Sequence, residues 1–130
     1  GALHIVRRSG RVLIVEDNDI NREIAESLLA EIGCEVDHAG DGLEAIDLCR
    51  TKAPDYYDLI LMDIHMPRMN GYDASRILKN ELHLETPIVA VTATSETREV
   101  VEQNREIIAG YLEKPYSPGA FRIMFSNYGK

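Results

Sequence analysis

Several features that would place this chain in a membrane or secreted class are scarce or missing. No stretch of about 18 consecutive apolar residues occurs, so no transmembrane helix is expected. The opening residues, GALHIVRRSG, lack the long apolar segment of a signal peptide. Both cysteines, Cys34 and Cys49, lack a metal-ligand or CxxC spacing. Because no disulfide framework is evident, we expect a cytoplasmic protein.

Positive charge is also scarce. The 130 residues include 14 Lys and Arg against 22 Asp and Glu, a formal net charge of −8, which argues against a nucleic-acid backbone as a direct partner. There are no internal repeats and no low-complexity segments. With 45% hydrophobic residues, the length suits one compact domain. We expect a tail or linker over residues 1–9 and the domain over residues 10–128.

Short apolar runs separated by helical patterns predict alternating strands and helices. The strands are expected at residues 11–15, 34–39, 58–62 and 88–91, and within 106–114. Runs 58–62 and 88–91 are continuously apolar, which is typical of strands buried on both faces. The order predicts an α/β layer sandwich with helices on both faces of a parallel sheet.

The helix patterns predict specific inward faces and ends. The first helix should end at Gly33 in the C′ position. Ser95 is predicted to cap the start of the fourth helix, and Asn104 to form a left-handed cap at its end. In the first helix the apolar residues recur at four-residue spacing and are expected to face inward: Ile20, Ile24, Leu28 and Ile32.

Polar side chains gather where the predicted strands end. Glu16 and Asp17 follow the first strand, Asp63 the third, Thr92 the fourth and Lys114 the fifth. In open parallel sheets, ligands bind beyond these carboxyl ends. Three carboxylates close together raise one another's pKa unless a cation lies among them. Oxygen ligands without His or Cys suit Mg²⁺.

This combination predicts phosphoryl chemistry. Mg²⁺ shares its coordination shell readily with a phosphate, and Lys114 and Thr92 supply donors for phosphoryl oxygens. An aspartate in such a site can act as the nucleophile and form an aspartyl phosphate. A single acid after a strand is more often a helix cap or turn residue, and we interpret Asp19 and Asp41 in this way.

The sequence resembles the receiver domain of two-component response regulators. The motifs are VLIVEDN (12–18), LILMDIHMPRMNGY (59–72), PIVAVTA (87–93) and YLEKP (111–115), and the match covers about residues 11–126. It is most similar to receivers of hybrid sensor histidine kinases or phosphorelays. The resemblance implies a flavodoxin-like, doubly wound (βα)5 fold with a five-stranded parallel sheet in the order 2-1-3-4-5.

The resemblance also implies roles for the catalytic and metal-binding residues. Asp63 would be the phosphoacceptor, and Lys114 would pair with the phosphoryl group. Mg²⁺ would be the cofactor. Its protein ligands would be three carboxylates and one main-chain carbonyl: Glu16, Asp17, Asp63 and the carbonyl of His65.

Further residues would act in switching and in setting the phosphoryl lifetime. Thr92 would turn toward the phosphoryl group and Tyr111 would follow as a rotamer switch. A cis peptide bond between Lys114 and Pro115 would aim the lysine. His65 either tunes water access or only points to solvent. The positions expected to tune access are His65, Ala93 and Thr94.

The function implied is a phosphorylation-controlled signalling module. The donor would be a phosphohistidine on a histidine kinase or histidine phosphotransfer protein that docks near the first helix. The face made by the fourth helix, fifth strand and fifth helix would then engage a homodimer partner or another domain. The chain would catalyse only its own phosphoryl transfer and autodephosphorylation, either alone or as part of a hybrid histidine kinase.

Two other classes remain open at this point. A Mg²⁺-dependent phosphatase or phosphotransferase with an aspartate nucleophile usually has a second acid two residues later and a cap region, whereas this chain has His65 there. A pseudo-receiver would keep the fold as a binding module without phosphorylation. Neither a membrane segment nor an output domain is expected in this sequence.

Overall fold

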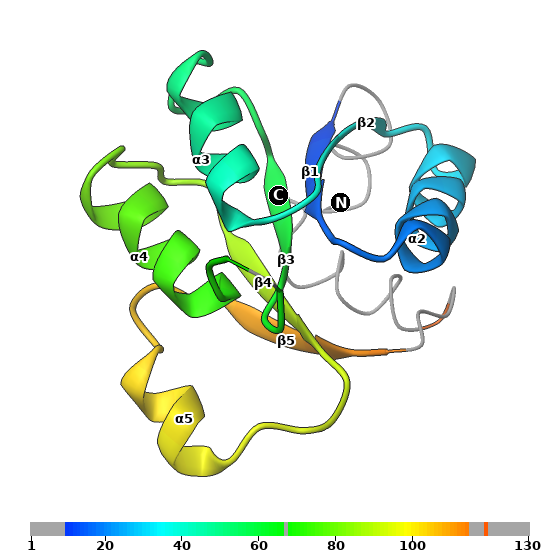
Figure 1. Ribbon diagram of the computed structural model, residues 1–130. Helices are drawn as coiled ribbons and strands as arrows, with labels where there is room; N and C mark the ends of the chain where they lie inside the picture. The colour runs from blue at the N-terminus through cyan, green and yellow to red at the C-terminus, as the bar shows by residue number, and fades with distance from the viewer. Residues whose placement is uncertain (1–9, 67, 115–118, 120–130) are drawn as a thin grey trace.

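A computed structural model describes residues 10–66, 68–114 and 119 of the protein. Figure 1 shows strands and helices that alternate along the chain. They are β1 (Arg11–Val15), α2 (Asp19–Glu31), β2 (Glu35–Ala39), α3 (Gly42–Arg50), β3 (Leu59–Asp63), α4 (Gly71–Asn80), β4 (Ile88–Thr92), α5 (Arg98–Gln103) and β5 (Gly110–Glu113).

The five strands form one parallel sheet in the order β2-β1-β3-β4-β5. This order confirms the predicted doubly wound α/β fold. After β2 the chain crosses β1 and continues on its other side, so β1 and β3 lie next to each other where the winding reverses. Ligand sites of open α/β sheets form at the carboxyl ends of the strands at such a reversal.

Helices cover both faces of the sheet, with α2 on one face and α3, α4 and α5 on the other (Figure 1). Alternate residues of β1 pack against opposite faces of the sheet. Val12 and Ile14 pack with Leu29 of α2, whereas Leu13 and Val15 belong to the core under α3 and α4. All residues of β3 and β4 are buried, as their continuous apolar runs predict. These two strands therefore form a rigid centre for whatever follows them.

The predicted inner face of the first helix is wrong in its first half. Ile20 is 69% exposed and Ile24 is 39% exposed, whereas the buried residues of α2 are Ala25 and Leu29. A strict four-residue repeat drifts by about 40° per step around a helix of 3.6 residues per turn, so it cannot follow one face. Gly33 has φ 85°, which confirms the predicted left-handed C′ glycine.

The ends of α5 also differ from prediction. Its N-cap is Thr97, whose side chain accepts a hydrogen bond from the N–H of Val100, so the cap predicted at Ser95 is wrong. Asn104 follows the helix with φ −110°, outside the left-handed region. Its side-chain amide donates to the Val100 carbonyl at 2.8 Å, and its backbone N–H donates to the same carbonyl at 3.2 Å, so Asn104 closes the helix end without a left-handed backbone.

Two acids that were assigned as caps or turns have different outcomes. Asp19 is the first residue of α2, because Asn18 is the N-cap and accepts from Asn21 N–H. Asp41 is the N-cap of α3 and accepts from Glu44 N–H at 3.0 Å. Most of the fifth helix, which is expected after β5, and the predicted cis bond between Lys114 and Pro115 lie outside the described residues.

Among the described residues, no helix is both long and apolar enough to cross a membrane.

Gly71 fixes the start of α4 against the end of β3. Its N–H donates to the Ile64 carbonyl at 2.9 Å. A Cβ atom at this position would collide with the Asp63 carbonyl oxygen and lie 2.9 Å from Ile64 Cα. Because both obstacles are backbone atoms, they cannot move aside as a flexible side chain could.

We therefore expect Gly71→Ala to lower the free energy of unfolding by about 1–3 kcal/mol, through overpacking. Urea unfolding would measure the loss. Gly119→Ala is the matched control, because a Cβ atom there meets nothing within 4 Å. Equal stability of the two variants would contradict this account of Gly71.

Candidate functional site

Three carboxylates meet at the ends of β1 and β3. Val15 pairs with Met62 in the sheet, so the next residue of each chain segment, Glu16 and Asp63, emerges at the same level. Glu16 is fully buried, Asp63 is 3% exposed, and Asp17 is exposed. Their ligand oxygens all lie within 4.8 Å of one another. The structure thus brings together the three acids that the sequence pattern predicts.

Lys114 supplies a positive charge to this cluster. Its Nζ lies 3.0 Å from Glu16 Oε1 and 3.3 Å from Asp63 Oδ2. Its backbone N–H donates to the Thr92 carbonyl at 2.8 Å, which extends the pairing of β4 and β5 by one residue. Burial favours the neutral amine, but Glu16 and Asp63 outweigh it and raise the pKa of Lys114. The side chain therefore remains an ammonium group between the two buried acids.

Glu16 is a buried carboxylate whose surroundings raise its pKa. Burial raises its pKa, and the nearby Asp63 adds to this effect, whereas Lys114 and the Asn18 N–H oppose it. Glu16 Oε2 accepts a hydrogen bond from Asn18 N–H at 3.2 Å. Oε1 is buried and accepts no hydrogen bond from any residue that the structure describes, although Lys114 lies at ion-pair distance.

One ammonium group does not balance three carboxylates. Holding three carboxylates together with a single ammonium group leaves an excess of negative charge, which is costly unless a further cation lies among them. A hard divalent cation with oxygen ligands fits both the charge and the donor set of Glu16, Asp17 and Asp63. The residues present therefore fit Mg²⁺.

The loop after β3 is tied to the acidic cluster through backbone groups. His65 N–H donates to Asp63 Oδ1 at 3.2 Å. Ile64 N–H donates to the Val91 carbonyl at 3.1 Å, which continues the pairing of β3 with β4. His65 itself is exposed, so its backbone N–H, rather than a buried imidazole, is the group that contacts Asp63.

Thr92 and Tyr111 line the same depression next to the cluster. Thr92 ends β4 and is 1% exposed, while Ala93 and Thr94 after it are exposed. Asp63 pairs with Val91, so Thr92 lies one residue beyond Asp63 on the neighbouring strand. A cavity of about 340 Å³ is lined by residues of β4, α5 and β5 and of the loop between β4 and α5: Thr92, Ser95, Glu96, Val101, Tyr111 and Glu113. The two predicted switch residues therefore share one space.

Tyr72 is a contact residue that sequence reasoning missed. Its hydroxyl lies 3.3 Å from the Tyr111 hydroxyl and 3.1 Å from Glu96 Oε1. Because a hydroxyl has one hydrogen, Tyr72 can donate to Glu96 while it accepts from Tyr111. Burial raises the pKa of Tyr72, so the group stays protonated. No sequence periodicity links positions 39 residues apart, so only the fold reveals this pair.

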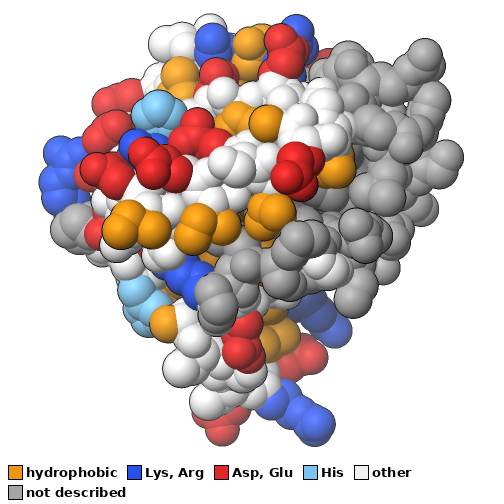
Figure 2. Space-filling model, turned by 90° about the vertical axis from the view of Figure 1, so that its right-hand side faces the viewer, with side chains coloured by type: hydrophobic (Ala, Val, Ile, Leu, Met, Phe, Trp, Pro, Cys, Tyr) orange, Lys and Arg blue, Asp and Glu red, His pale blue; other side chains and the backbone are white. Residues whose placement is uncertain are grey.

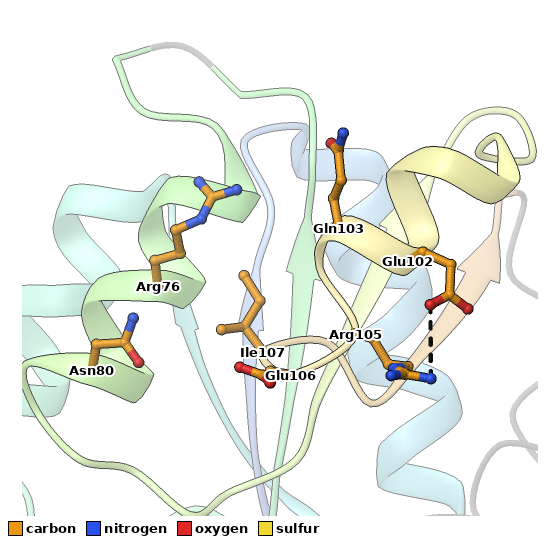
Figure 3. Close-up of a pocket in the computed structure, with 7 residues that line it drawn as sticks. All are labelled: Arg76, Asn80, Glu102, Gln103, Arg105, Glu106 and Ile107. Carbon is orange, nitrogen blue, oxygen red and sulfur yellow. Dashed lines mark ion pairs between the residues drawn. The ribbon is translucent and has the colours of Figure 1, made fainter.

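A separate cavity of about 330 Å³ opens between α4 and the end of α5 (Figure 3). Arg76 Nη2 donates to Asn104 Oδ1 at 3.0 Å, and Glu102 pairs with Arg105 at 3.7 Å. The lining carries both signs of charge and includes none of the predicted site residues. The candidate site is therefore the acidic cluster and not this cavity.

Comparisons with known proteins point to one family. The model of the response regulator receiver domain matches residues 12–125. The sensor kinase/phosphatase LuxN of Vibrio campbellii is 37% identical over 126 residues, which cover 97% of this chain and 14% of LuxN. The response regulator DivK of Brucella anthropi is 35% identical over 118 residues, which cover 90% of this chain and 94% of DivK. This chain therefore spans only a small part of LuxN but nearly all of DivK.

A solved structure is also similar. The response regulator protein TrrA of Thermotoga maritima, solved in complex with Mg²⁺–BeF, has a TM-score of 0.77 and 26% sequence identity. The match covers 90% of this chain and 96% of TrrA.

The acidic cluster generates a prediction about metal binding. Glu16→Gln removes one buried charge with little change in shape, so we expect Mg²⁺ affinity to fall at least about tenfold. Isothermal titration calorimetry would measure the dissociation constant. Glu31→Gln, at an exposed position of α2, is the control for a change in net charge alone. The same dissociation constant in Glu16→Gln and wild type would refute the proposed ligand.

Proposed function

Because the chain belongs to the response regulator receiver domain family of two-component signalling, we propose that it accepts a phosphoryl group from a phosphohistidine onto Asp63. The observation that carries this proposal is the surroundings of Asp63. The buried carboxylate ends the central strand β3, lies within 4.8 Å of two other acids and receives the Lys114 ammonium at 3.3 Å.

Asp63 acts as the nucleophile. One carboxylate oxygen forms a bond to phosphorus while the P–N bond of the phosphohistidine breaks, and the imidazole leaves with the bonding electron pair. Lys114 stabilises negative charge on the transferred oxygens, because its ammonium group already lies next to the Asp63 carboxylate. The His65 N–H holds the other carboxylate oxygen and orients the group for attack.

Mg²⁺ is the proposed cofactor. Glu16, Asp17, Asp63 and the main-chain carbonyl of His65 would hold it, and when bound it would neutralise charge on the phosphoryl oxygens. The excess of negative charge in the cluster, with three carboxylates and the single ammonium group of Lys114, supports this assignment. The Mg²⁺–BeF complex of TrrA, a protein of the same family, supports it as well.

The lifetime of the phosphoryl group depends on access of water to Asp63. His65, Ala93 and Thr94 are exposed residues directly after β3 and β4, so their side chains can set this access. Ala93 is small and leaves the approach open. Autodephosphorylation is then the only steady reaction that the chain needs to catalyse by itself.

Switching begins at Thr92. A phosphoryl group on Asp63 attracts the Thr92 hydroxyl from the neighbouring strand, and movement in the shared cavity reaches Tyr111. The face around α5 and β5 then changes shape and engages a second copy of the chain or another domain. Tyr72 and Glu96 contribute hydrogen bonds that Tyr111 must keep or exchange during this change.

The phosphodonor is a histidine kinase or a histidine phosphotransfer protein. Ile20 and Ile24 are large apolar side chains exposed on α2, the helix that follows Glu16 and Asp17 in the chain. Figure 2 shows this side of the molecule, where hydrophobic side chains are exposed among acidic ones. An exposed apolar surface on the helix that follows two of the site acids suits a protein donor better than a small phosphoester. Both a free-standing receiver and a segment of a hybrid kinase are compatible with the relatives.

We expect Asp63→Asn to abolish labelling by a phosphotransfer protein that carries ³²P-phosphohistidine, in the presence of Mg²⁺, because the amide is not a nucleophile. Autoradiography measures the label. Asp55→Asn, at an exposed position, is the control. Labelling of Asp63→Asn at the wild-type rate would remove Asp63 as the acceptor. Steady hydrolysis of p-nitrophenyl phosphate by wild type would instead favour a phosphatase.

The donor surface can be tested separately from the chemistry. The double variant Ile20→Ala, Ile24→Ala should slow transfer from the phosphotransfer protein by roughly tenfold, since apolar anchors dominate such contacts. Phosphorylation by the small donor phosphoramidate should be unchanged. Glu23→Ala on the same helix is the control. An equal slowing with both donors would show damage to the site itself and contradict a docking role.

A further inference from the structure

Arg68 lies at the outer part of the loop between β3 and α4 and reaches another helix. Its Nε lies 2.6 Å and its Nη2 2.5 Å from the same oxygen, Asp41 Oδ2. The two residues are 27 positions apart, and the contact joins this loop to the N-terminus of α3.

The Asp41 carboxylate binds two separate segments, the first turn of α3 and the loop between β3 and α4. Its Oδ1 accepts the Glu44 N–H and caps α3, while its Oδ2 accepts from Arg68. Its side chain is only 8% exposed, whereas that of Arg68 is 56% exposed. Burial alone would raise the pKa of Asp41, but the Glu44 N–H and Arg68 outweigh it and hold the pKa below its usual range. Without Arg68, a nearly buried carboxylate oxygen would lose its charged partner.

The backbone of Arg68 has φ 68°, in the left-handed region that an arginine rarely adopts. Glycine would fit this conformation without strain. An arginine at this position therefore needs a compensating interaction, and the ion pair with Asp41 provides one.

The same loop is fixed to the phosphorylation site at its beginning. His65 N–H donates to Asp63 Oδ1, and Gly71 N–H closes the loop on the Ile64 carbonyl. Next to Arg68, Met69 lies close enough to α3 that a Cβ atom on Gly42 would be 3.4 Å from its Cγ and its carbonyl oxygen. The loop is thus held at its base by backbone bonds and further out by α3.

We propose that Arg68 is a positioning residue: its ion pair with Asp41 anchors the loop to α3 and so holds His65 in place against Asp63. The inference rests on the proposed function, because His65 matters only if Asp63 accepts a phosphoryl group and its carbonyl holds Mg²⁺. Arg68 itself contacts neither Asp63 nor any other member of the acidic cluster among the described contacts.

The test uses Arg68→Gly, which removes the ion pair but suits the positive φ. We expect Mg²⁺ affinity and the rate of phosphorylation by phosphoramidate each to fall roughly tenfold, as for residues that orient metal ligands. His83→Gly is the matched control, because His83 is also a non-glycine residue with positive φ, 58°, and is exposed. It should leave both quantities unchanged.

Asp41→Asn tests the other partner, because asparagine caps a helix as well as aspartate does. It should reproduce the loss seen in Arg68→Gly, and the double variant should be no worse than either single variant. Arg68→Lys should keep part of the Mg²⁺ affinity that Arg68→Gly loses, since lysine retains a positive charge at this position. Asp47→Asn, which breaks an exposed ion pair with Arg50 in the same helix, is the control.

The outcomes separate this inference from the proposed function. Failure of the wild-type chain to bind Mg²⁺ or to accept a phosphoryl group would overturn the proposed function and this inference with it. A normal wild type with an Arg68→Gly variant that loses only thermal stability, at unchanged Mg²⁺ affinity and rate, would overturn the inference alone. Additive losses in the double variant would also overturn it.

Discussion

The sheet holds carboxylates that repel one another close together, and the rest of the site depends on this constraint. Two adjacent parallel strands end at the same level, so Glu16 and Asp63 have no freedom to separate. Lys114, from the far edge of the sheet, offsets part of this repulsion at 3.0 and 3.3 Å. The remaining excess of negative charge favours a cation among the three acids and, in the function proposed above, prepares the site for a phosphoryl group. The register of β1 against β3 thus determines which charged groups meet in the site.

Much of this arrangement could be predicted from the sequence because it depends on strand ends. A continuous apolar run such as that of β3 shows where a buried strand stops, and in a parallel sheet all such ends lie on one side. Asp63 and Lys114 could therefore be brought together without a structure. The helix faces were harder to predict: Ile20 and Ile24 are apolar but exposed, since apolar spacing alone does not show whether a partner covers them.

Side-chain contacts between elements far apart in the sequence could not be predicted at all. Tyr72 meets Tyr111, and Arg68 meets Asp41, across segments with no shared periodicity. Arg68 also adopts a left-handed backbone conformation, which local propensity would not predict for an arginine. Such contacts depend on the relative placement of elements that are already folded.

The excess of negative charge in the acidic cluster has a thermodynamic consequence. A buried charge cluster that lacks full compensation lowers the stability of the native state, while the unfolded chain leaves these acids in water. Any ligand that binds the native cluster alone therefore shifts the folding equilibrium as well. A cation bound by Glu16, Asp17 and Asp63 would therefore link its occupancy to folding. Part of its free energy of binding would appear as resistance of the sheet to unfolding.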